Sequence, residues 1–166
     1  MQARSGGFSM LELMVVVAII AILALLAAPN FQDSIVRNEI KATLPLADIA
    51  KQPVAAMWAV AQAFPKDNTE ALLPPPEKIV NNQISSVAIA NGAINITFGN
   101  NANGIIKGKV LTLRPAVVLD APVVPVTWVC GTAEAPNQMT VQGVNNTNIP
   151  DTFLPFNCRA HIKAAQ

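Results

Sequence analysis

The chain has 166 residues, a formal net charge of +1 and an apolar content of 52%. A near-neutral chain gives no electrostatic argument for binding nucleic acid. With one histidine and two cysteines, a cysteine-based zinc site is not expected, and we find no phosphate-binding loop, dinucleotide fingerprint or catalytic triad motif. We therefore expect neither an enzyme nor a protein that holds a metal or another cofactor.

A long apolar run near the N-terminus is the most informative feature of the sequence. Residues 8–28 contain Glu12 as their only ionisable side chain. As a helix they would span about 32 Å, enough to cross a bilayer core of roughly 30 Å. A carboxylate inside such a helix is costly and rare, so Glu12 is a candidate functional residue that needs a positively charged partner.

Two ordinary kinds of N-terminal segment explain this run poorly. A secretory signal peptide would account for Arg4 and the apolar residues, but the residues just before Pro29 form a poor cleavage site. A plain signal anchor would account for the hydrophobicity, but not for Gly7 at the polar boundary or for Glu12 beyond it.

The same residues resemble the N-terminus of the type IV prepilins. In that family a short basic leader ends in glycine, here Gly7, and is followed by Phe8, by Glu12 at the fifth mature position and by Pro29 at the end of the apolar helix. The resemblance implies that a prepilin peptidase removes residues 1–7 and methylates the new amino terminus at Phe8. It also implies that the apolar helix stays in the inner membrane, with the C-terminal domain in the periplasm, until the pilus assembly platform draws the subunit into an extracellular filament.

The chemistry of the cut N-terminus gives a physical reason for Glu12. Cleavage leaves a positively charged amine on Phe8, and a buried charge is tolerated only when it is paired. The carboxylate of Glu12 can meet that amine within its own helix, four residues away, or across a staggered bundle in a neighbouring subunit. Between subunits, the pair would set the register of the helices.

Residues 29–64 are expected to continue the helix. Pro29 should kink the helix rather than end it, because an amphipathic pattern resumes after it. Pro45 and Pro53 each lack a backbone donor and should bend this second half. Trp58 lies in an apolar stripe that is suited to packing on a sheet.

A proline-rich loop over residues 65–85 and a sheet over residues 86–131 are expected next. Asn91-Gly92 favours a type I′ hairpin turn, because both residues tolerate positive φ. The expected strands cover residues 86–90, 93–98, 105–113 and 126–130, with a proline-bounded connection over 114–125. Strands in sequence order with short links predict a four-stranded antiparallel sheet packed on the helix, which is an α+β fold.

The last segment, residues 130–158, shows little periodicity and is expected to form a loop. Cys130 and Cys158 at its ends suit a disulfide if the domain folds outside the cytoplasm, as the prepilin resemblance implies. Two free thiols are the alternative. Loops on rigid scaffolds often carry recognition.

The resemblance extends more loosely to residues 104–114, 126–131 and 154–159, which are similar to the sheet and C-terminal loop of type IVa pilins. It implies a major pilin, a structural subunit that polymerises through its N-terminal helix into a filament for adhesion, twitching motility or DNA uptake. The partners would be other copies of the chain, the peptidase and the assembly platform.

Two alternative functions stay open. A type II secretion pseudopilin shares the N-terminus, but the major ones typically lack the disulfide loop and carry a calcium site, for which no carboxylate cluster is found. A minor pilin for DNA uptake would need a basic surface, and Lys107, Lys109 and Arg114 could place charge on one strand. Three basic residues on a near-neutral chain are more often a solvated face.

Overall fold

The computed structural model describes residues 7–27 and 29–160. The chain divides into two units, Met1–Ser34 and Ile35–Gln166. The first unit contains helix α1 (Met10–Ala27) and the beginning of helix α2 (Pro29–Thr43), and the second contains the rest of α2 and the α+β domain that follows it.

Helix α1 is built from apolar residues on all sides, with Glu12 in its first turn. It begins at Met10 rather than at Phe8 because Ser9 caps it, as described below. Its 18 residues correspond to about 27 Å of helix. Within the described ranges, we find no helix whose length and apolar character together suffice to cross a membrane. The last residue of the predicted run, residue 28, lies outside the described residues.

The prolines have different effects on the helices. Pro29 is the first residue of α2, a position where its missing N–H costs nothing; the junction to α1 falls at residue 28, so the kink stays a prediction. Pro45 lies in a 3-10 turn, η1 (Leu44–Ala47), that separates α2 from α3 (Asp48–Ala61). The α-helical hydrogen-bond pattern is therefore interrupted at Pro45, whereas α3 continues through Pro53.

Helix α3 ends at Ala61, before the predicted end at residue 64. Gln62 takes a left-handed conformation, with φ of 50°, and its N–H donates to the carbonyl of Trp58 at 2.9 Å. This is the usual way in which a helix satisfies its last carbonyls. Trp58 is buried in the core, as predicted, and its ring stacks on Phe64 with centroids 5.0 Å apart.

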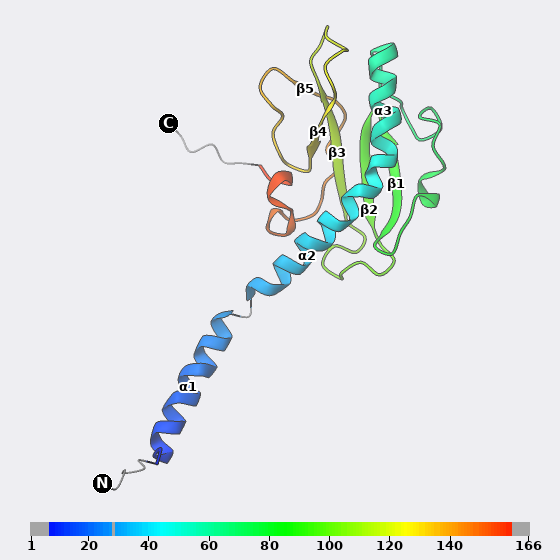
Figure 1. Ribbon diagram of the computed structural model, residues 1–166. Coiled ribbons are helices and arrows are strands. Elements are labelled where there is room, and N and C mark those ends of the chain that lie inside the picture. Colours follow the sequence, from blue (N-terminus) through cyan, green and yellow to red (C-terminus); the bar gives the residue numbers. More distant parts are fainter. Residues whose placement is uncertain (1–6, 28, 161–166) are drawn as a thin grey trace, which may run out of the picture. The chain divides into compact units, whose positions relative to one another are not determined.

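The described part of the chain forms one antiparallel sheet of five strands. They are β1 (Ile84–Ala90), β2 (Ala93–Phe98), β3 (Val110–Val117), β4 (Thr127–Cys130) and β5 (Thr140–Val141). The order is β1-β2-β3-β4, and β5 pairs with β3. The predicted α+β class is confirmed, and Figure 1 shows α3 lying against the sheet. The fifth strand was not predicted, because two residues are too few to give a periodic pattern.

The β1–β2 hairpin agrees with its prediction. Asn91 and Gly92 both have positive φ, 48° and 82°, as a type I′ turn requires. A Cβ on Gly92 would lie 2.8 Å from the Phe64 side chain, so this glycine is also needed for packing.

Strand β3 lies further along the chain than predicted. Residues 104–108 form a turn in which the N–H groups of Ile106 and Lys107 donate to the Asn103 carbonyl, and Ile106 is buried in the core. The apolar residues before position 110 therefore reflect a buried turn and not a strand.

Strand β3 continues through Pro115. The sequence analysis had placed this proline in a connection between two strands. The Pro115 carbonyl accepts a hydrogen bond from the N–H of Gln142, which lies beside β5, on one edge of β3. An N–H group at position 115, which proline lacks, would point to this same edge. There, β2 pairs only as far as Leu113 and β5 begins pairing at Ala116. Pro115 thus occupies a position where no strand needs its N–H.

The core lies between the helices and one face of the sheet. The helical side chains recur at the spacing of one helix face and the strand side chains at alternate positions, as an amphipathic helix on a half-buried sheet requires. The main contributors are Val36, Ile40, Ala47, Ala50, Val54, Ile84, Val87, Ile89, Ile94, Ile96, Phe98, Leu111 and Leu113.

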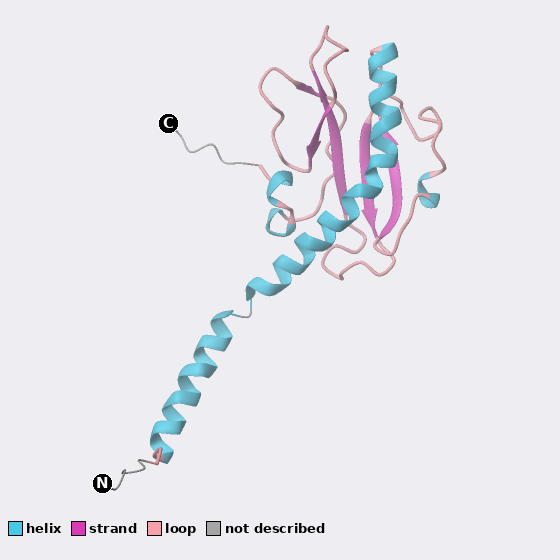
Figure 2. Ribbon diagram, viewed as in Figure 1, coloured by secondary structure: helices cyan, strands magenta, loops and turns pink. Residues whose placement is uncertain are grey.

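The loop between α3 and β1 covers the outer edge of β1. Asn68 is buried, and its side-chain amide donates to the carbonyl of Val87 and accepts from the N–H of Ile89, at 3.0 and 2.7 Å. One side chain therefore satisfies two backbone groups of an edge strand. Figure 2 shows this loop and the loops after β4.

The segment after β4 wraps around β3. On one edge β5 pairs with Ala116 and Val117. On the other edge, beyond the end of β4, Asn148 exchanges hydrogen bonds with Val110, and Thr147 accepts from the N–H of Thr112. The loop between these contacts passes over the sheet face opposite the helices, where it covers the buried Thr112.

Candidate functional site

The candidate processing site lies just before helix α1. Phe8 is exposed, and nothing approaches within 4 Å of the position that a Cβ on Gly7 would take. Ser9 ends this non-helical stretch, because its carbonyl accepts the first helical hydrogen bond, from the N–H of Leu13 at 3.2 Å. The Gly7–Phe8 bond therefore lies outside the helix.

Ser9 and Glu12 form a reciprocal cap at this end. The Ser9 hydroxyl oxygen accepts from the N–H of Glu12 at 3.2 Å, and the Glu12 carboxylate accepts from the N–H of Ser9 at 3.5 Å. This arrangement is a capping box, whose Ser-x-x-Glu signature is present in the sequence. A negative charge in the first turn also interacts favourably with the helix dipole. Glu12 thus has a local role that the sequence analysis missed, and its pairing with the Phe8 amine stays a prediction.

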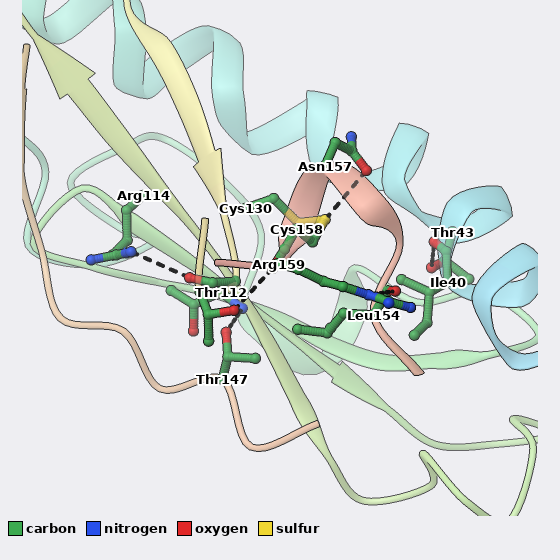
Figure 3. The surroundings of a disulfide bond; sticks show 12 residues. Ile40, Thr43, Thr112, Arg114, Cys130, Thr147, Leu154, Asn157, Cys158 and Arg159 are labelled. Atoms are coloured by element: carbon green, nitrogen blue, oxygen red, sulfur yellow. Dashed lines mark hydrogen bonds between the residues drawn. A yellow bond between two sulfur atoms is a disulfide. The ribbon is translucent and has the colours of Figure 1, made fainter. Parts of the chain in front are cut away.

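The disulfide is the second candidate site. Cys130 and Cys158 are bonded, with their Cα atoms 4.5 Å apart, which confirms the predicted pair. Around it, the carbonyl of Cys158 accepts from the N–H of Thr132 at 3.0 Å, and the Thr132 hydroxyl accepts from the N–H of Ala160 at 3.0 Å. Figure 3 shows the disulfide between β4 and the C-terminal segment. Covalent and hydrogen bonds together hold that segment to the sheet.

A second set of contacts fixes the C-terminal segment to the helix. Arg37 of α2 and Arg159 each donate to the carbonyl of Thr152 at 3.0 Å. Arg159 also donates to the carbonyl of Leu154 at 2.7 Å, and Figure 3 shows its side chain reaching toward that residue. Residues 115 positions apart in the sequence are joined in this way, so no local pattern could have predicted it.

Loss of the disulfide should destabilise the domain. We expect Cys158→Ser to lower the free energy of unfolding by about 2–5 kcal/mol and to reduce the amount of subunit that accumulates. Cys130→Ser and the double variant should give the same loss, because each removes the same bond. Denaturant titration of the full chain in detergent measures the loss. Thiol labelling of the unfolded, unreduced wild type checks the bond itself, and labelling of either cysteine would contradict it.

Gly131, next to the disulfide, should also be intolerant of substitution. Its φ is +56°, and a Cβ would lie 2.6 Å from the carbonyl oxygen of Cys158. We expect Gly131→Ala to cost about 1–3 kcal/mol of stability. Gly104→Ala is the matched control, because nothing lies within 4 Å of the added atom. Equal melting temperatures for the two variants would contradict this explanation.

The three basic residues considered for DNA binding do not form one exposed strand surface. Lys107 lies in the turn before β3 and donates to the carbonyl of Asn100 at 2.8 Å. Arg114 lies on β3 and donates to the carbonyl of Gly131 at 3.2 Å, and Figure 3 shows its side chain beside Thr112. Burial lowers the pKa of the Arg114 guanidinium. Arg114 is thus part of the packing between the sheet and the loop.

No set of three or more histidine, cysteine, aspartate or glutamate side chains that could hold a metal ion occurs among the described residues. The described residues thus form an apolar helix with a capped N-terminus and an α+β domain that is fixed by a disulfide.

Two family models match the chain. The model for pilin, a bacterial filament protein, matches residues 36–159, and the model for the prokaryotic N-terminal methylation motif matches residues 2–28. The chain belongs to the pilin family. It is therefore a structural filament subunit and not an enzyme, as the sequence analysis expected.

Curated relatives support this assignment. The chain is 32% identical to a type IV major pilin protein, PilE, of Neisseria gonorrhoeae over 96% of both chains. It is 31% identical to a fimbrial protein of Neisseria meningitidis serogroup A, covering 92% of this pilin and 93% of the relative. It is 36% identical to the fimbrial protein EcpC of Eikenella corrodens, covering 92% and 90%. The similarity thus includes both the N-terminal helix and the α+β domain.

Proposed function

We propose that this pilin is the major subunit of a type IV pilus and polymerises through α1. The observation that carries the proposal is the composition of α1, whose apolar side chains are exposed in the single chain. A helix that is apolar on all sides must be covered by lipid or by other helices. A filament core of such helices, each from one copy, provides that cover.

We further propose the path by which the subunit reaches the filament. A prepilin peptidase cuts after Gly7 and methylates Phe8, and the methylation motif supports both steps. Before assembly, residues 8–28 anchor the subunit in the inner membrane with its α+β domain in the periplasm. The assembly platform then moves it into an extracellular filament, in which the carboxylate of Glu12 pairs with the Phe8 amine of a neighbouring copy.

The relatives' names support the major-subunit role over the alternatives. The PilE relative is named a type IV major pilin protein, and its alignment covers 96% of this chain. The positions of Lys107 and Arg114 give no support to a DNA-binding minor pilin, and the disulfide loop is atypical of a major pseudopilin. The filament would serve adhesion, twitching motility or DNA uptake.

Subunit abundance in sheared surface filaments tests the proposal. The filaments of a cell that expresses this chain are sheared off, and their subunits are quantified by mass spectrometry. We expect this chain to dominate the preparation. A trace amount would identify a minor pilin instead, and its absence from filaments would favour a pseudopilin.

A further inference from the structure

The helices of the α+β domain carry a second apolar stripe on their solvent-facing side. Buried residues of α2, η1 and α3 are followed, two positions later, by exposed apolar residues. The buried residues are Ile40, Ala47, Val54 and Trp58, and the exposed ones are Ala42, Ile49, Ala56 and Val60. Two positions correspond to about 200° of rotation on an α-helix. The exposed residues therefore lie opposite the core, and Figure 1 shows the sheet on one side of α3 only.

The stripe repeats every seven residues. One series consists of Ile35, Ala42, Ile49 and Ala56, and a second series consists of Leu46, Pro53 and Val60. We call these seven residues the outer seam; all of them belong to the second unit, and none is ionisable. Leu46 and Pro53 are half-buried, whereas Ile35 and Ile49 are 55% and 49% exposed. Two apolar positions in every seven residues form the seam along which one helix packs on another, so the pattern indicates that a further helix covers the outer seam.

The outer seam ends in an apolar groove between α3 and the loop that follows it. The groove has a volume of about 410 Å³, and its lining includes Pro53, Ala56 and Val60 of the seam and Leu72 of the loop. Val60 and Leu72 are 89% and 93% exposed in the single chain. Leu72 also has a positive φ of 56°, a costly conformation for a bulky residue. The fold thus holds large apolar side chains in solvent on both sides of this groove.

Helix α1 of another copy has the properties that the outer seam requires of its partner. Its 18 residues include Glu12 as the only ionisable one, and its apolar side chains are exposed on all sides. Its length of about 27 Å is within the span of residues 35–60, which corresponds to about 38 Å of helix. Two outer seams packed on each other would be a contact between like surfaces, which closes into a dimer, whereas a filament requires two different surfaces on each copy. The outer seam and α1 meet this requirement.

We infer that in the filament α1 of one copy packs along the outer seam of another copy and places one of its large apolar side chains in the groove; this inference rests on the proposed polymerisation. The volume is sufficient, since cavities of about 150 Å³ in protein cores accept a benzene ring. The contact differs from a bundle of α1 helices alone, because the α+β domain then binds the apolar helix of its neighbour directly.

Site-specific photo-cross-linking in assembled filaments tests this contact. The full chain with p-benzoylphenylalanine in place of Ile49 is produced together with the wild-type chain, the sheared filaments are irradiated, and the cross-linked peptides are identified by mass spectrometry. We expect dimers in which position 49 is joined to residues 10–27 of another copy. The control carries the same group at Val144, which is 69% exposed and should not label α1. Cross-links from position 49 to another outer seam, to lipid or to a different protein, or no cross-links at all, would overturn the inference.

Two substitutions give an independent measurement. Ala42→Glu and Ala56→Glu each place a carboxylate on the outer seam. Both sites are exposed in the single chain and glutamate is a good helix former, so the subunit should accumulate at the wild-type level. Covering an unpaired carboxylate with an apolar helix is costly, and we expect each variant to reduce filament yield by about tenfold or more. Ala59→Glu is the matched control, because Ala59 is exposed on the same helix but lies outside the outer seam; its filament yield should be unchanged.

The outcomes separate this inference from the proposed function. If the wild-type chain forms no filaments, the proposed function fails. If the wild type forms filaments and both glutamate variants of the outer seam form them at the same yield, only the contact between α1 and the outer seam is refuted.

Discussion

Replacing Gly7 with phenylalanine is expected to leave residues 1–7 attached to the subunit and to stop filaments from forming. No atom lies within 4 Å of a Cβ added at this position, so the substitution should not disturb the fold. Its effect would arise in the peptidase site, where a bulky residue before the Gly7–Phe8 bond prevents binding. Mass spectrometry of the membrane fraction should show the intact leader, whereas wild-type filaments should contain a chain that begins at N-methyl-Phe8.

Gly104→Phe is the matched control for this prediction. Gly104 also has no neighbour within 4 Å of an added Cβ, but it lies far from the leader in the sequence. Its processing should be normal, which would assign the effect of Gly7→Phe to its position and not to the added ring. Filaments built from subunits that keep residues 1–7 would disprove the assigned cleavage site.

The sequence was sufficient to predict the structure where the chemistry of neighbouring residues determines it. The Asn91-Gly92 turn forms because both residues accept positive φ, and the strand that follows has the predicted bounds, Ala93–Phe98. The disulfide could be predicted because a chain with two cysteines that folds outside the cytoplasm has one possible pair. The family could be recognised because its signature is a short run of residues, from Gly7 to Pro29.

The sequence-based prediction failed where contacts between distant residues determine the structure, or where an element is too short to give a pattern. Strand β5 is two residues long and exists only because it pairs with the end of β3. The turn before β3 contains two adjacent isoleucines, which resemble the start of a strand, but Ile106 is buried in a turn by tertiary packing. The side chain of Asn68 forms hydrogen bonds with backbone groups of an edge strand, 19 and 21 residues away. Nothing in the sequence around a polar loop residue predicts such contacts. The capping box at Ser9 is different, since its signature was present and was overlooked.

That capping box makes a sharp test of Glu12 possible. Glutamine is accepted at the third helical position of a capping box, so Glu12→Gln removes the negative charge while it preserves the hydrogen bonds that start α1. Ser9→Ala does the opposite, because it removes the hydroxyl that accepts from the N–H of Glu12 and keeps the charge. The two variants therefore separate the charge from the cap.

We expect Glu12→Gln to be processed and to accumulate normally but to reduce filament yield by more than tenfold. Neutralising one member of a buried ion pair leaves its partner uncompensated, which costs about 3–5 kcal/mol, and the filament would repeat this loss at every copy. Ser9→Ala should assemble at close to the wild-type yield, because a lost cap costs only about 1 kcal/mol. Quantification of sheared filaments against total subunit measures both effects. If Glu12→Gln assembles normally, Glu12 does not set the register by charge; if Ser9→Ala fails as severely as Glu12→Gln, the cap and not the ion pair is what assembly requires.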